Sequence, residues 1–124
     1  MINAAKYCKI KLYQSTDWST TKWNIVYYDM DGGGSSACLA IANGVAGSSS
    51  VQQHKYNVVA NVNPGAGKYP SMDIDSQGRP HIAFFGPRGS SQNQGNLAIH
   101  YIAATGNAPS NQNNWTYTLI KDFG

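Results

Sequence analysis

Glutamate is absent from this chain of 124 residues, and all six of its acidic residues are aspartate. Only 12% of the residues are charged, well below the quarter or so of a typical soluble domain. Long helices normally carry glutamate and lysine on their solvent-facing side, so this absence argues against a helical fold. It also removes the residue most often used as the general acid in glycoside hydrolysis.

Long apolar runs and dense basic stretches are missing too. No run of about eighteen apolar residues occurs, so the sequence predicts no membrane span. Residues 1–6 lack the basic-then-apolar pattern of a signal peptide. The formal charge of +3 is not gathered into a basic stripe, so we expect no nucleic-acid partner. Serine, threonine, asparagine, glutamine and glycine supply the polarity instead, a composition that favours an extracellular or cell-surface protein.

Cysteine is scarce, with only Cys8 and Cys38. No C-x-x-C spacing occurs, which excludes a zinc ribbon and a thioredoxin-type site. Cys8 precedes the first expected strand and Cys38 opens the third. If both strands belong to one sheet, a disulfide would form in an oxidising compartment. Two buried free thiols are the equal alternative.

An internal repeat organises what is present. The triplet Leu39-Ala40-Ile41 recurs 58 residues later as Leu97-Ala98-Ile99, and Ile25 aligns with Ile82. Repeats of this length are the sequence signature of stacked structural units. We therefore interpret residues 1–124 as a single domain of two units, about 7–63 and 68–124.

Each unit holds four stretches of strand length and composition. Lys9–Tyr13 and Ser71–Asp75 alternate polar and apolar residues, which is typical of half-buried strands. Four short strands in sequence order predict an all-β fold of two four-stranded antiparallel meanders, similar to two β-propeller blades. An eight-stranded β-sandwich is the alternative. The expected strands are 9–13, 23–29, 38–42, 54–59, 71–75, 80–86, 96–101 and 115–120.

The second unit resembles the BNR/sialidase-like propeller repeat. That family runs Pro-Ser, alternating apolar residues, Asp-x-x-Gly-x-Pro, His, a β-branched or aromatic strand, a Leu-x-Tyr strand and a Trp. Residues 68–85, followed by 95–101 and Trp115, follow this pattern over about 55 residues, and the first unit follows it more loosely. The resemblance implies a propeller fold. It does not carry sialidase activity over, because the chain has two arginines and only two blades' worth of strands.

The segment Ser15–Trp23 resembles the Asp-box of sialidases, Ser-x-Asp-x-Gly-x-Thr-Trp. Ser19 replaces the glycine, and one extra residue precedes the tryptophan. An Asp-box is a turn that its own side chains stabilise. It is structural and does not mark an active site.

Histidine offers the main candidate for chemistry. His81 and His100 lie in neighbouring expected strands and would face one another, but a metal site needs further ligands such as Asp73 or Asp75. We expect His81 to hydrogen-bond within the sheet instead. The EF-hand spacing is not met around Asp29-Met30-Asp31. No nucleophile–base pattern stands out, so we predict no enzymatic activity, no metal and no cofactor.

Aromatic residues suggest a ligand-stacking role, since their rings can stack on sugars. The candidates are Trp18, Trp23, Tyr69 and Trp115. Two blades would leave exposed apolar faces and open edges, which other units must cover. We therefore expect a non-enzymatic interaction or structural module that self-associates or joins other blades of a longer chain. A glycan-binding module and a fragment of a glycosidase-like enzyme are the alternatives.

Overall fold

The computed structural model describes residues 5–29, 38–58, 66–88 and 97–123. These residues form eight strands in two antiparallel four-stranded sheets, each in sequence order. No α-helix occurs in the described ranges, and none of their elements is a helix with the length and apolar character to cross a membrane. The strands are β1 (Ala5–Gln14), β2 (Thr21–Asp29), β3 (Cys38–Val45), β4 (Val51–Tyr56), β5 (Lys68–Ile74), β6 (Pro80–Pro87), β7 (Leu97–Ala104) and β8 (Trp115–Asp122), with a 3-10 turn, η2 (Gln112–Asn114), before β8.

The all-β prediction is confirmed, and all eight expected strands are present. Two strands differ most from the predicted bounds: β1 begins four residues earlier, at Ala5, and β4 lies three residues earlier at both ends, from Val51 to Tyr56. The residues Val51, Gln52 and Gln53 pair with Gly44, Asn43 and Ala42 of β3. Because β4 is an edge strand, its polar start needed no apolar alternation to join the sheet.

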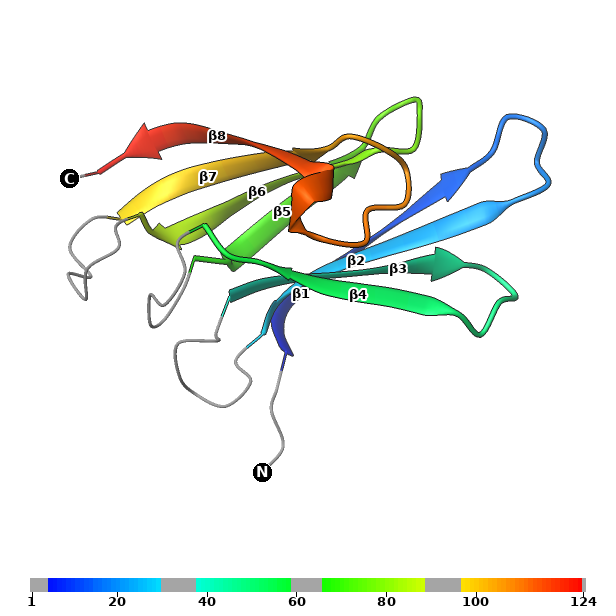
Figure 1. The fold of residues 1–124 in the computed structure, drawn as a ribbon, viewed down its shortest axis with the longest axis horizontal. Coiled ribbons are helices and arrows are strands. Elements are labelled where there is room, and N and C mark those ends of the chain that lie inside the picture. Colours follow the sequence, from blue (N-terminus) through cyan, green and yellow to red (C-terminus); the bar gives the residue numbers. More distant parts are fainter. Residues whose placement is uncertain (1–4, 30–37, 59–65, 89–96, 124) are drawn as a thin grey trace.

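The two sheets lie one over the other and share one hydrophobic core (Figure 1). Strand alternation supplies the core side chains from one face of each sheet. The core residues of the first sheet include Val26, Leu39, Ile41 and Tyr56, and those of the second include Met72, Ile82, Phe84, Ile102 and Trp115. The Trp115 indole Nε1 donates a hydrogen bond across the core to His54 Nε2 at 2.8 Å.

The hairpin turns that open each sheet are both built on an aspartate. Between β1 and β2, Asp17 Oδ1 accepts hydrogen bonds from Ser15 Oγ and from Ser19 N and Oγ. Between β5 and β6, Asp75 Oδ1 accepts from the backbone N–H groups of Gln77 and Arg79. The first turn is therefore stabilised by its own side chains, as the sequence predicted.

Gly78 closes the second of these turns with a φ of +79°. A Cβ at this position would lie 2.9 Å from the Tyr13 ring on β1. Glycine is needed here for two reasons, since the backbone is left-handed and an aromatic ring of the other sheet packs onto it.

Candidate functional site

The outer faces of the two sheets carry apolar side chains that the fold leaves uncovered. On the first sheet, Ile10 and Leu12 of β1 are 60% and 65% exposed and pair with Ile25 and Trp23 of β2. On the second sheet, a shallow hollow of about 350 Å³ is lined mainly by Tyr69, Ser71, Ala83, Phe85 and Ile99. We call these surfaces the first outer face and the second outer face.

The internal repeat relates these outer faces to the core. Ile82 is fully buried in the core, whereas its repeat equivalent Ile25 lies on the first outer face. Conversely, Ile41 is fully buried in the core, whereas its equivalent Ile99 lines the hollow of the second outer face. The two sheets therefore meet through opposite faces of the repeated unit. A symmetric face-to-face pairing of two repeats would bury equivalent positions instead.

The first strands of the two sheets, β1 and β5, lie side by side. Each has a break in its register, at Lys6–Lys9 and at Lys68–Ser71, and a tyrosine with positive φ lies in each break. The rings of these residues, Tyr7 and Tyr69, are 4.6 Å apart. A tyrosine in the left-handed region costs free energy, so this ring contact and the bulges must hold the conformation in place.

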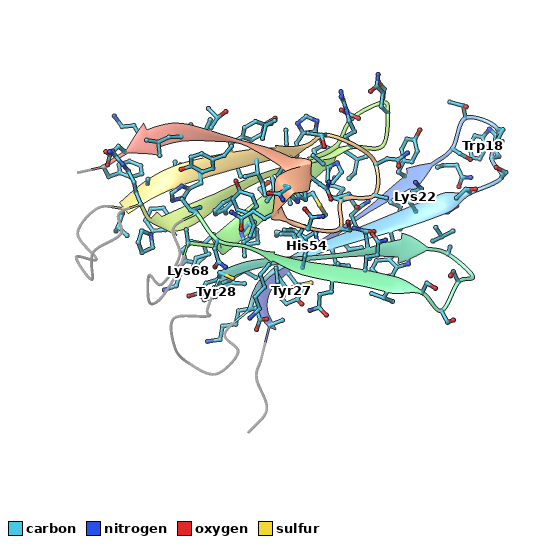
Figure 2. The ribbon with its side chains drawn as sticks, in the orientation of Figure 1. Trp18, Lys22, Tyr27, Tyr28, His54 and Lys68 are labelled. Atoms are coloured by element: carbon cyan, nitrogen blue, oxygen red, sulfur yellow. The ribbon has the colours of Figure 1, made fainter. Side chains whose placement is uncertain are left out.

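The predicted stacking residues do not come together. Trp18 lies at the tip of the β1–β2 turn and is 79% exposed (Figure 2). The Trp23 ring packs against Gly44, where an added Cβ would be 2.4 Å from the indole. Trp115 is only 7% exposed, because its ring fills the core. Trp115 is thus a core residue, and the prediction that it stacks on a ligand is wrong.

His81 and His100 do not face one another. His100 pairs with Phe84 on the core face, whereas His81 projects from the opposite face of β6. His81 Nε2 lies 3.1 Å from Asp75 Oδ2, and its Nδ1 bonds the Tyr101 hydroxyl at 2.5 Å. Within the described ranges, no three potential ligands gather as a metal site. Met30 and Asp31 lie outside the described residues.

The two cysteines are both free thiols. Cys38 is buried, and burial raises the pKa of its thiol to about 11, so it is a poor nucleophile. Cys8 is exposed on β1. The structure therefore contains no Cys8–Cys38 disulfide, and only Cys38 fits the alternative of buried thiols.

The chain matches no protein-family model, no curated protein and no solved structure. The resemblance to the BNR/sialidase-like repeat therefore rests on the sequence pattern alone.

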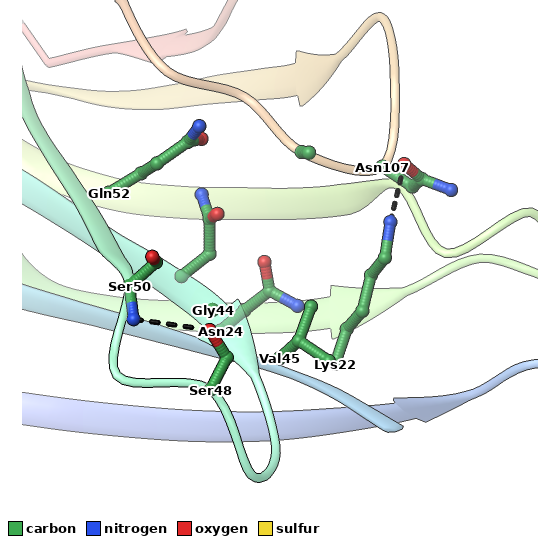
Figure 3. Close-up of a pocket in the computed structure, with 10 residues that line it drawn as sticks. Lys22, Asn24, Gly44, Val45, Ser48, Ser50, Gln52 and Asn107 are labelled. Atoms are coloured by element: carbon green, nitrogen blue, oxygen red, sulfur yellow. Dashed lines mark hydrogen bonds between the residues drawn. The ribbon is translucent and has the colours of Figure 1, made fainter. Parts of the chain in front are cut away.

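A polar pocket at the turn end of the first sheet was not predicted. Register places Asn24 of β2 beside Asn43 of β3, which in turn pairs with Gln52 of β4. These side chains line a cavity of about 160 Å³ together with Lys22, Ser48, Ser50 and Asn107 (Figure 3). The Lys22 ammonium donates to Asn107 Oδ1 at 2.9 Å, so the connection between β7 and β8 closes one side.

The side chain of Asn24 in this pocket is unusual because its buried amide is not hydrogen-bonded within the described ranges. It is 1% exposed, yet neither its amide nitrogen nor its amide oxygen has a hydrogen-bond partner among the described residues. Its neighbour Asn43 turns its amide nitrogen to Pro109 O at 2.7 Å. A buried amide left without partners costs about 1–3 kcal/mol. The sequence contains one indication of this buried polar pair. Asn24 and Asn43 occupy core-facing positions in line with Val26 and Ile41, where apolar residues are expected.

Proposed function

We propose that this chain is a non-enzymatic, propeller-like module that self-associates head to tail. The second outer face of one copy packs onto the first outer face of a second copy. The observation that carries the proposal is the opposite-face packing of the repeat. The second outer face is the repeat equivalent of the core face of the first sheet, and the first outer face is the equivalent of the core face of the second.

Such a contact would repeat, between copies, the packing that already joins the two sheets within one copy. It is heterologous, so copies add in one direction and either close into a ring or extend as a filament. Propellers typically hold roughly four to eight sheets, which about two to four copies would supply. The exposed apolar side chains Ile10 and Leu12 would then be covered, as the large apolar patches of soluble proteins usually are.

The chemistry of the first strand supports the same contact. Lys9 and Lys11 of β1 alternate with Ile10 and Leu12, so the edge of the first sheet is lined with charge. Lysine on an edge strand discourages pairing of sheet edges. Association through faces is therefore favoured over extension of the sheet.

The solution mass of the chain, measured by light scattering on a sizing column over a range of concentrations, tests this proposal. We expect a discrete oligomer or a growing series of species, with the fraction of single chains falling as concentration rises. A chain that stays monomeric at every concentration would overturn the proposal.

A further inference from the structure

The polar pocket offers a second, independent site. Asn24, Asn43 and Gln52 form a row of amides across three strands, and the pocket lies between the first sheet and the β7–β8 connection of a single copy. It does not depend on the outer faces. We propose that this pocket binds a neutral, hydroxyl-rich ligand, such as one sugar residue of a glycan.

The unpartnered amide of Asn24 points to a ligand. Almost all buried side-chain polar atoms in proteins have a hydrogen-bond partner. Both polar atoms of Asn24 lack one among the described residues, although Asn43 lies directly opposite on β3. The cavity beside Asn24 is large enough for several atoms beyond a single water, at about 160 Å³.

The lining selects the class of ligand. An amide offers both donors and an acceptor, which suits a pair of neighbouring hydroxyl groups that donate and accept in turn. Among the described lining residues there is no carboxylate, which disfavours a metal ion or an amine. Their one charged group, Lys22, already donates to Asn107 Oδ1. A neutral polyhydroxy compound therefore fits the donor and acceptor set better than an anion.

Nuclear magnetic resonance of the full chain tests the proposal directly. D-galactose, D-mannose and N-acetyl-D-glucosamine would each be titrated to about 50 mM, beyond the millimolar dissociation constants of weak sites. At least one should shift the side-chain amide signals of Asn24, Asn43 and Gln52. N-acetylneuraminate and inorganic phosphate serve as anionic probes.

Variants separate this site from general surface binding. Asn24→Leu should weaken binding about tenfold or more, because the paired donor and acceptor are lost, and should raise the thermal midpoint. Gln52→Ala, at an exposed position that does not threaten the fold, should weaken binding several-fold. Asn113→Leu, an exposed asparagine of η2, is the matched control and should bind as the unmodified chain does.

Three results would overturn the proposal. One is the absence of any shift with all three sugars, which would make the pocket a site for water only. Another is a response to the anionic probes alone. The third is unchanged sugar binding in Asn24→Leu.

Discussion

His100 is fully buried in the core and is held by two hydrogen bonds. Its Nε2 lies 3.1 Å from Gly86 O, which only accepts, so Nε2 carries the proton. Its Nδ1 then accepts from the Tyr117 hydroxyl at 2.6 Å. Burial lowers the pKa of His100, and burial likewise lowers the pKa of His54, whose Nε2 accepts from Trp115. Both side chains are thus neutral in the fold.

We expect the free energy of unfolding to fall as pH drops from 7.5 to 5.5. A histidine with a lowered pKa in the fold takes up its proton first in the unfolded chain, near pH 6.5. Its stabilisation is complete above that pH and is lost as pH falls toward the folded pKa. Each histidine contributes at most about 1.4 kcal/mol per pH unit. Urea unfolding at the two pH values measures this.

His54→Gln should reduce the pH dependence without abolishing it, because His100 remains. The lowered pKa values of Asp17 and Asp75 keep both carboxylates ionised throughout this pH range, so they do not contribute. Equal stability at both pH values would show that neither histidine is held neutral.

A second prediction at the residue scale concerns three glycines. Gly78→Ala should destabilise the fold by about 2 kcal/mol or more, because it combines a left-handed backbone with a clash. Gly47 has a φ of +85° and open space around it, so Gly47→Ala should cost only the backbone strain, about 1 kcal/mol. Gly106 has neither feature, so Gly106→Ala should be nearly neutral. Thermal unfolding ranks the three, and an equal loss for Gly78 and Gly47 would contradict the contact with Tyr13.

At the scale of elements, the two aspartate turns perform the same task with different partners. Three hydrogen bonds from Ser15 and Ser19 hold the pKa of Asp17 at about 2. Asp75 accepts from His81 and from Arg79, and these bonds hold its pKa well below the usual range. Each turn fixes the first hairpin of its sheet and thereby the register of β1 on β2 or of β5 on β6.

Asp17→Ala should lower the thermal midpoint at pH 7, and Asp17→Asn, which keeps one acceptor oxygen, should lower it less. The stabilisation from Asp17 is present above the unfolded pKa of 3.8 and is lost as pH falls toward 2. The difference between Asp17→Ala and the unmodified chain should therefore shrink near pH 2. Asp73→Ala, which removes one exposed hydrogen bond from the adjacent Ile74 N–H and a long, exposed contact to Lys11 at 4.0 Å, is the control and should have little effect. A difference that persists unchanged at pH 2 would show that the carboxylate is not the cause.

Period-two alternation in Lys9–Tyr13 and Ser71–Asp75, together with the internal repeat, predicted the strands from the sequence, because each sheet buries one face. The bulges at Tyr7 and Tyr69 were not predictable in this way, since the ring contact that holds them joins residues 62 positions apart. His81 and His100 were misplaced for a similar reason. Whether two side chains on neighbouring strands lie on the same face of the sheet depends on the register of the strands. A shift of one residue moves a side chain to the opposite face.

At the scale of the whole molecule, the internal repeat predicted the number of sheets but not which faces of the sheets meet. Ile25 and Ile82 look equivalent in the alignment, yet only Ile82 enters the core. The difference arises because the two sheets stack head to tail. One face of the repeated unit enters the core in the first sheet, and the opposite face enters it in the second. The polar pocket was missed because its cavity forms only when the connection at Asn107 crosses the turn end of the first sheet.

The most direct test of head-to-tail association uses two variants, each blocked on one face. Leu12→Lys places a charge on the first outer face and Ile99→Lys places one in the hollow of the second, with Ser76→Lys at an exposed turn as control. Each face variant alone should be monomeric by light scattering, once its thermal unfolding shows that it is folded. The control should assemble as the unmodified chain does.

A mixture of the two face variants tests head-to-tail association directly, because each variant retains the outer face that is blocked in the other. Head-to-tail association predicts a one-to-one dimer of Leu12→Lys with Ile99→Lys that grows no further. A mixture that remains monomeric, or a single variant that assembles like the unmodified chain, would contradict it.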